Sequence, residues 1–156
     1  MIAAGGIADG RGLAAVLMLG AEGAWIGTRF VASPEASSAN WIKERVVAAG
    51  TDDTVLTRVY DLATDAPFPP GIGDRVLRNE LTDAWHSRGE EEIIAARANL
   101  NARIAAASGD ARIAPARAGN AAGLIHELAP AGEIVRRLAT EAERILRERP
   151  AALLTA

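Results

Sequence analysis

Residues 1–30 read MIAAGGIADG RGLAAVLMLG AEGAWIGTRF, and this stretch decides the fold. A first apolar run, residues 1–4, ends on Gly5 and Gly6. A second apolar run, residues 24–26, is closed by Gly27 and Thr28. Short apolar runs closed by glycine are typical of buried strands that enter tight loops. The stretch therefore predicts two strands, each followed at once by a glycine loop.

Helical patterns separate and follow these two strands. Asp9 is placed to cap a first helix, and Gly20 is placed to end it. Ser33 is expected to cap a second helix that has Pro34 at its first position and that ends at Gly50. The order strand, helix, strand, helix predicts parallel β/α packing with right-handed crossovers.

The rest of the chain shows a different pattern. Residues 54–60 predict a short extended segment, whereas residues 66–73 hold too many prolines and glycines for regular structure. Beyond them, helices are predicted over residues 74–85, 90–107 and 132–149. A loop of small residues, 118–124, separates the last two of these helices.

Composition excludes several classes of protein. With 156 residues the chain is long enough for one compact core, and it is 49% apolar but only 4% aromatic, which favours helices. The net charge is -3, and the acidic and basic residues are interspersed along the chain. The sequence therefore lacks the basic stripe that would predict nucleic-acid binding. Cysteine is absent. The apolar run over residues 13–19 is shorter than the roughly 20 residues of a membrane span, so we expect a soluble, cytoplasmic protein.

Two parallel strands cannot bury both of their faces by themselves. A parallel sheet needs neighbouring strands and cover on both sides. We therefore expect the chain either to pair with another polypeptide or to be a piece of something larger, and we favour the second interpretation.

Glycine loops after parallel strands are where α/β proteins bind anions. Backbone amides point outward there, the missing Cβ lets a phosphate approach, and the following helix presents its positive end. In a (β/α)8 barrel the common phosphate site uses the loops after strands 7 and 8. The Thr28 hydroxyl adds another donor. The alternative is that these glycines only turn the chain.

The same residues resemble the nitronate monooxygenase family, once called 2-nitropropane dioxygenases. The resemblance lies in residues 3–12 and 19–30, and it extends to residues 67–73, to Arg78, Asn79 and Trp85, and to residues 118–125. It implies an FMN-dependent barrel that oxidises alkyl nitronates with molecular oxygen. The fold class implied is α/β: the last two β/α units of a TIM (β/α)8 barrel, incomplete as a barrel, followed by an α-helical segment.

The resemblance also implies a division of the chain and a cofactor site. Residues 1–60 are expected to form the last barrel units, residues 61–73 a Pro/Gly-rich linker, and residues 74–156 a helical segment that borders the substrate side. The family holds the FMN phosphate with backbone amides, which in this sequence belong to Gly5, Gly6, Trp25, Ile26, Gly27 and Thr28. Trp25 stands where family members usually have Gln, a change that a backbone contact is expected to tolerate.

No catalytic residue is predicted in this chain. In the family, the flavin-ring contacts and a catalytic His belong to the N-terminal half, so a missing N-terminal half of the barrel is the expected partner. His86 and His126 do not match the position of that His, and a structural or solvent-facing role is the prediction for both. No metal site is predicted.

Three other features keep alternatives open. Arg11 and Arg29 flank the glycine loops and are candidates to contact a phosphate, and Arg29 is as readily expected to cap or brace the barrel rim. Residues 119–123 either line the substrate side of the flavin or form a turn between helices. The alternatives for function are a flavin-dependent enoyl reductase, an inactive truncated fragment and a helical interaction module.

Overall fold

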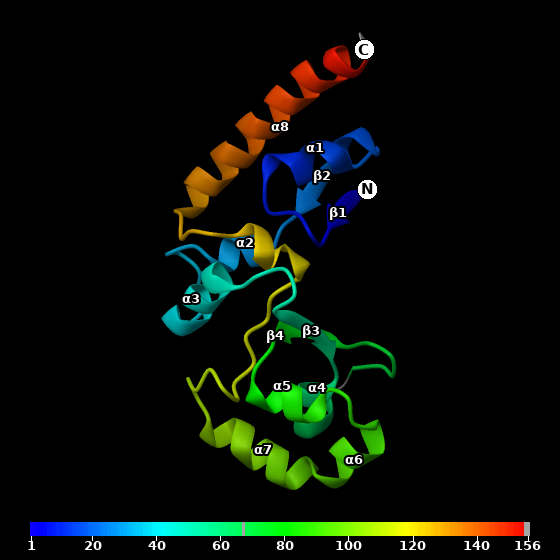
Figure 1. Cartoon of the computed structure of the whole chain (residues 1–156), viewed down its shortest axis with the longest axis vertical. Coiled ribbons are helices and arrows are strands. Elements are labelled where there is room, and N and C mark those ends of the chain that lie inside the picture. Colours follow the sequence, from blue (N-terminus) through cyan, green and yellow to red (C-terminus); the bar gives the residue numbers. More distant parts are fainter. Residues whose placement is uncertain (67, 155–156) are drawn as a thin grey trace.

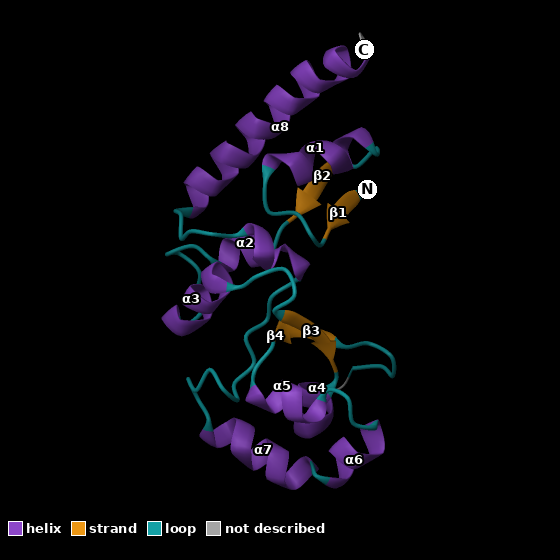
Figure 2. Cartoon of the chain, viewed as in Figure 1, coloured by secondary structure: helices purple, strands orange, loops and turns teal. Residues whose placement is uncertain are grey.

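The computed structural model describes residues 1–66 and 68–154, so residue 67 of the Pro/Gly-rich segment and residues 155–156 lie outside the description. Two groups of elements follow one another along the long axis of the chain (Figure 1). One group is formed by the elements within residues 1–48 and 131–154. The other is formed by the elements within residues 54–106, and each group has its own small sheet (Figure 2).

The predicted strand–helix–strand unit is confirmed. Strand β1 (Ile2–Ala4) and strand β2 (Gly23–Trp25) pair in parallel, and helix α1 (Gly10–Met18) connects them. The Asp9 carboxylate accepts a hydrogen bond from the Gly12 amide at 3.0 Å, which caps α1 as predicted. At the other end of α1, Gly20 has a φ of 95°, a conformation that lets the chain turn away from the helix.

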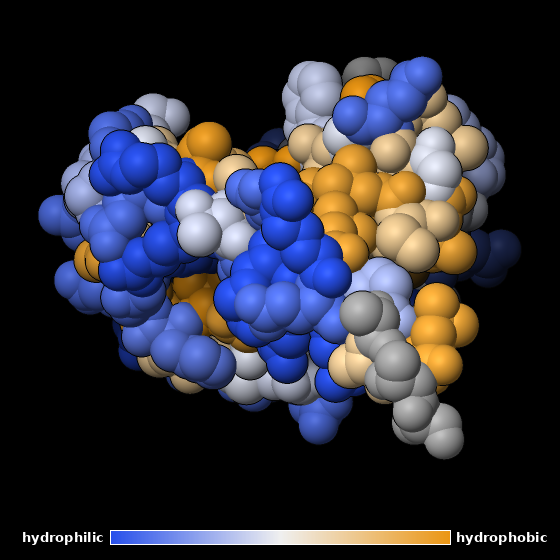
Figure 3. Space-filling model, turned by 90° about the horizontal axis from the view of Figure 1, so that it is seen from above, coloured by the Kyte–Doolittle hydropathy of each residue, from blue (hydrophilic) through white to orange (hydrophobic). Residues whose placement is uncertain are grey.

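This parallel sheet stops at two strands. In the described part of the chain two separate two-stranded sheets occur, and no closed barrel is formed. Ile2 is 57% exposed and Trp25 is 76% exposed, so apolar side chains of both strands face solvent. From above, the molecular surface likewise shows a hydrophobic area beside hydrophilic ones (Figure 3).

The second predicted helix differs in the structure. A short helix α2 (Thr28–Val31) comes first, and α3 (Asn40–Ala48) begins well after Ser33. The expectation that Ser33 caps a helix was wrong, because its hydroxyl instead donates to the Phe30 carbonyl oxygen at 2.8 Å. Ser33 therefore satisfies a carbonyl at the end of α2 rather than amides at the start of α3.

The helix predicted over residues 74–85 is wrong in its first four residues. Strand β4 (Asp74–Leu77) pairs antiparallel with β3 (Thr54–Thr57), and only then does α5 (Glu80–Trp85) begin. Asn79 forms a capping box with Thr82 that fixes the start of α5. The extended segment predicted over residues 54–60 is confirmed for residues 54–57, which form β3, but was wrong at its end, because residues 59–60 belong to α4 (Val59–Thr64).

The helix predicted over residues 90–107 is two helices. Helix α6 (Glu90–Ala95) and helix α7 (Arg97–Ala106) meet at Ala96, whose φ and ψ of -88° and 1° interrupt the helical path. Ile93 of α6 and Leu100 of α7 both lie in the core under β3 and β4. The division of the chain into residues 1–60, 61–73 and 74–156 stays a prediction. The pairing of β3 with β4 joins residues on both sides of the 61–73 segment.

The last helix of the chain packs on the first group of elements. After the 3-10 helix η1 (Asn120–Leu124), α8 (Ala131–Leu154) returns to pack along α1 (Figure 1). The approach is closest at Gly10, where an added Cβ would lie 2.4 Å from the Glu141 Cβ. None of the helices among the described residues is long and apolar enough to cross a membrane.

Candidate phosphate site

The two glycine loops leave the sheet at the same end. Since Ala4 is the parallel partner of Trp25, the residues that follow each strand emerge side by side. The first loop contains Gly5 and Gly6, and the second contains Gly27 and Thr28. The carboxyl ends of parallel strands are where α/β proteins bind their ligands, so the pairing places the two loops as a phosphate site requires.

The first loop has a conformation that glycine favours. Gly5 and Gly6 have φ values of 89° and 73°, which side chains other than glycine rarely tolerate. An added Cβ at either position would meet no atom within 4 Å, so packing does not explain these glycines. Across residues 1–66 and 68–154, no backbone hydrogen bond outside the helices and strands uses the amide of Gly5, Gly6 or Gly27 as donor.

The second loop is similarly open at its glycine and is anchored by its neighbours. Gly27 precedes α2 without a side-chain cap, and an added Cβ there would also meet open space. Ile26 packs against the cluster formed by Ala129, Ile134 and Leu138. The Thr28 hydroxyl accepts a hydrogen bond from the Gly119 amide at 2.9 Å, and its own proton stays free to be donated.

The open glycines and their amides fit a phosphate group. An anion that approached here would meet hydrogen-bond donors and no Cβ atoms. The Trp25 side chain is 76% exposed beside the second loop.

The N-terminus of α1 is already occupied by carboxylates. The Asp9 side chain accepts from the Gly12 amide, and Glu141 of α8 accepts from the Gly10 amide at 2.8 Å. The sequence pointed to Asp9 but not to Glu141, because the contact joins residues 131 positions apart. These two carboxylates neutralise the positive end of α1. An anion at this end of the sheet would therefore have to bind to the amides of the glycine loops.

The two arginines beside the loops are engaged elsewhere. Arg11 forms an ion pair with Asp9 at 2.6 Å. Arg29 is 7% exposed and donates to the carbonyl oxygens of Ala32 and Glu127. Arg29 therefore ties α2 to the segment that leads to α8.

The remaining candidates are the two histidines and residues 119–123. His126 and His86 are both exposed, in agreement with the solvent-facing role predicted for them. Residues 119–123 approach the second loop through the Gly119 amide, and an added Cβ at Gly123 would lie 2.6 Å from the Thr51 amide nitrogen. The described residues contain no group of three or more His, Cys, Asp or Glu side chains that would hold a metal ion.

Together these features define an α/β protein with two open glycine loops at the carboxyl ends of two parallel strands. Its fold is similar to that of FabK from Thermotoga maritima, with a TM-score of 0.79 and 35% identity over 97% of this chain and 46% of that one. It is also similar to a nitroalkane oxidase from Streptomyces ansochromogenes, with a TM-score of 0.67 and 30% identity over 92% of this chain and 39% of that one.

The family follows from the sequence match. The family model for nitronate monooxygenase matches residues 1–141, and the chain belongs to this family. It is 39% identical to a nitronate monooxygenase of Neurospora crassa over 93% of this chain and 38% of that protein. The resemblance seen in the sequence is thus confirmed. The chain spans about two fifths of the length of that relative.

Proposed function

We propose that this chain contributes the FMN phosphate site of an enzyme that oxidises alkyl nitronates with molecular oxygen. The observation that carries the proposal is the parallel pairing of β1 and β2 in a chain of the nitronate monooxygenase family. This pairing brings two open glycine loops to one edge of the sheet. The residues proposed to hold the phosphate are those inferred from the sequence: Gly5, Gly6, Trp25, Ile26, Gly27 and Thr28.

Each loop contributes to phosphate binding in its own way. The amides of Gly5, Gly6 and Gly27 donate to the phosphate oxygens, and the Thr28 hydroxyl donates its proton while its oxygen accepts from Gly119. FMN, when bound, supplies the electron acceptor for oxidation of the nitronate. The chain's own task is to hold and orient that cofactor.

We also propose that the active enzyme includes barrel strands beyond β1 and β2. The exposed apolar side chains of Ile2 and Trp25 support this, because a parallel pair is normally covered by further strands. The proposal predicts that the gene encodes, upstream of codon 1 or in a separate frame nearby, strands and a His that acts as the base. A gene region without such a sequence would contradict it.

The phosphate site is tested by comparing FMN with riboflavin, which lacks the phosphate. We expect the purified chain to quench FMN fluorescence on binding, and to bind riboflavin about tenfold or more weakly, because the charge-assisted hydrogen bonds are lost. Equal affinities for the two flavins would overturn the site.

A matched pair of glycine variants separates the site from general damage. Gly6→Ala and Gly109→Ala both place Ala at a positive φ (73° and 85°) with no atom within 4 Å of the new Cβ. Both variants therefore carry a similar backbone cost, of about 1–2 kcal/mol. Only Gly6→Ala is expected to weaken FMN binding, because only its methyl group enters the space proposed for the phosphate.

The proposed reaction has its own test. A flavin-dependent enoyl reductase remains the alternative inferred from the sequence. Oxygen uptake on addition of propyl-2-nitronate to the longest product of the gene is expected for the proposed oxidation. Oxidation of NADH or NADPH with an enoyl thioester, without oxygen uptake on a nitronate, would favour the reductase.

A further inference from the structure

The Thr28 hydroxyl of the second loop is held by a segment far away in the sequence. The Gly119 amide donates to the Thr28 Oγ1 atom at 2.9 Å, and the two residues lie 91 positions apart. A hydroxyl group has one proton and two acceptor positions, so an amide donor at Oγ1 limits how the hydroxyl is turned. Within residues 1–66 and 68–154 the proton of Thr28 has no acceptor. This proton is therefore available to a ligand.

The β3–β4 sheet determines where Gly119 lies. The Ala116 carbonyl oxygen accepts from the Leu77 amide of β4 at 2.8 Å. The Ala118 amide donates to the Arg75 carbonyl oxygen of the same strand at 3.1 Å. The chain therefore runs beside β4 up to the residue before Gly119. The amide that meets the hydroxyl is thus placed by the group of elements that contains β3 and β4.

The 3-10 helix η1, which begins after Gly119, packs tightly against the turn before β3. An added Cβ at Gly123 would lie 2.6 Å from the Thr51 amide nitrogen and 2.7 Å from the Thr51 Cα. Both atoms belong to the backbone, so a side chain at position 123 would push η1 away from the turn. The Gly119 carbonyl oxygen accepts from the Ala122 amide at 3.0 Å, which joins Gly119 to η1. A displacement of η1 is therefore passed on to Gly119.

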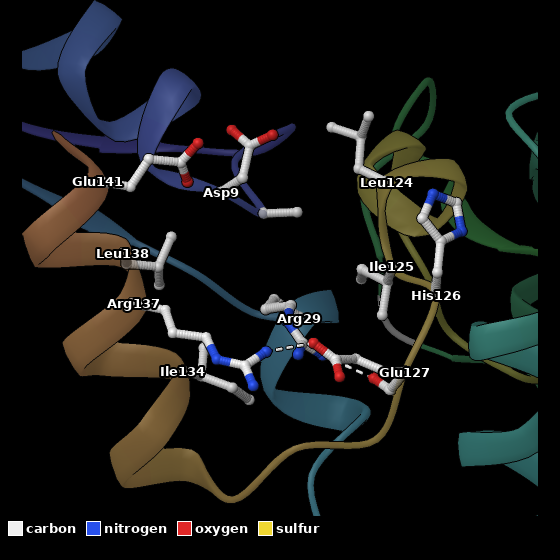
Figure 4. Close-up of a pocket in the computed structure, with 11 residues that line it drawn as sticks. Asp9, Arg29, Leu124, Ile125, His126, Glu127, Ile134, Arg137, Leu138 and Glu141 are labelled. Atoms are coloured by element: carbon white, nitrogen blue, oxygen red, sulfur yellow. Dashed lines mark hydrogen bonds and ion pairs between the residues drawn. The ribbon is translucent and has the colours of Figure 1, made fainter. Parts of the chain in front are cut away.

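The far end of the same segment is tied to α2 as well. Figure 4 shows Arg29 of α2 and Glu127 on the wall of a cavity, and Arg29 donates to the Glu127 carbonyl oxygen at 3.1 Å. The Ala129 amide donates to the Ala32 carbonyl oxygen at the end of α2, at 3.3 Å. The segment 119–129 is thus attached to α2 near both of its ends, and η1 lies between these attachments.

We propose that Gly119 is a positioning residue for the Thr28 hydroxyl, and that η1 thereby sets the preference of the site for a phosphorylated flavin. The inference rests on the function proposed above. The Gly119 amide occupies the Thr28 oxygen, so the hydroxyl is presented to the phosphate as a donor. Phosphate oxygens accept hydrogen bonds strongly, and a donor that is already oriented binds them best.

The test measures the ratio of FMN affinity to riboflavin affinity by fluorescence quenching of the purified chain. Gly123→Ala displaces η1, and we expect this ratio to fall about fivefold or more, because the hydroxyl no longer meets the phosphate in the favoured orientation. A general loosening of the fold would weaken the binding of both flavins alike and leave the ratio unchanged. Ile93→Val, which shortens a buried side chain in the other core cluster, is the control and should leave the ratio as it is.

A second background shows whether Gly123→Ala acts through Thr28. The hydroxyl is absent in Thr28→Val, so adding Gly123→Ala there should lower the ratio no further. A further fall by the same factor would overturn the inference, because the effect would then reach the flavin by another route. If Gly123→Ala does not fold, Ala122→Gly loosens η1 without a steric clash and should lower the ratio in the same direction.

The outcomes separate this inference from the proposed function. A parent chain that prefers FMN, together with a folded η1 variant that keeps the parent's ratio, would overturn the positioning role and leave the phosphate site standing. A parent chain that binds the two flavins equally would overturn the phosphate site itself.

Discussion

Replacing Gly10 by Ala should destabilise the chain, although alanine is the better helix former. Gly10 is the first residue of α1, and an added methyl carbon would lie 2.4 Å from the Glu141 Cβ and 2.7 Å from the Ala142 amide nitrogen. Both distances are far inside van der Waals contact, and one of the two atoms belongs to the backbone of α8. Relief therefore requires α1 and α8 to move apart.

The size of the effect follows from two opposing contributions. Overpacking of this kind costs about 1–3 kcal/mol, whereas alanine gains at most about 1 kcal/mol over glycine within a helix. Separating the helices also weakens the 2.8 Å hydrogen bond from the Gly10 amide to Glu141. We expect a net loss of about 2 kcal/mol, equivalent to a fall in melting temperature of about 4–8 °C for a chain of this length.

Equilibrium unfolding in urea, followed by circular dichroism, measures this loss. Gly12→Ala is the matched control in the same helix, because its new Cβ would meet only ordinary contacts, the nearest of them 3.4 Å from the Ile7 Cγ2 atom. We expect Gly12→Ala to be as stable as the parent chain or more stable. A Gly10→Ala variant with an unchanged or raised urea midpoint would refute the reasoning.

Three further predictions concern single side chains. Asn79→Ala should lose about 2–4 kcal/mol in urea unfolding, since it removes both the cap of α5 and the buried hydrogen bond to the Tyr60 hydroxyl; a loss below about 1 kcal/mol would contradict this. Thr28→Val should cost about 1–2 kcal/mol, because it leaves the Gly119 amide without its acceptor, and should also weaken FMN binding; unchanged FMN affinity would remove Thr28 from the site. Burial, together with the nearby Asp74, raises the pKa of Asp61 in the folded chain. The protonated carboxyl is therefore tolerated at a pH below the unfolded pKa, and the folded chain loses stability as the pH rises and Asp61 ionises. Asp61→Asn should therefore be more stable than the parent chain at pH 7, and the difference should vanish by about pH 3; a difference that does not change with pH would be inconsistent with a raised pKa.

The sequence predicted the local features that one stretch of chain determines by itself. The strand, glycine loop and helix of residues 1–20 follow from apolar runs, from the cap at Asp9 and from Gly20, and all of these appear in the structure. The parallel pairing followed as well, because a helix of this length between two strands permits little else.

The prediction failed where distant partners decide the local structure. Residues 74–77 become a strand because Thr54–Thr57 lies alongside them, and their own pattern of side chains is also compatible with a helix. The helix predicted over residues 90–107 is broken at Ala96, a residue type with high helix propensity, and nothing in the local sequence indicates the break.

The same limit applied to the site. The glycines of the first loop, Gly5 and Gly6, could be found in the sequence, since their positive φ values demand that residue type. Glu141 could not, because nothing near position 141 indicates that its carboxylate meets the amide of Gly10. Partners of this kind become visible only when α8 is seen against α1.

The bond between Glu141 and Gly10 also has a consequence for biosynthesis. A ribosome delivers the amino-terminal residues first, and the residue that closes the start of α1 emerges 131 positions later. Until then the helix that follows the first glycine loop lacks one of its two carboxylate partners. The nascent chain can therefore fasten its first glycine loop to α8 only after Glu141 has left the ribosome.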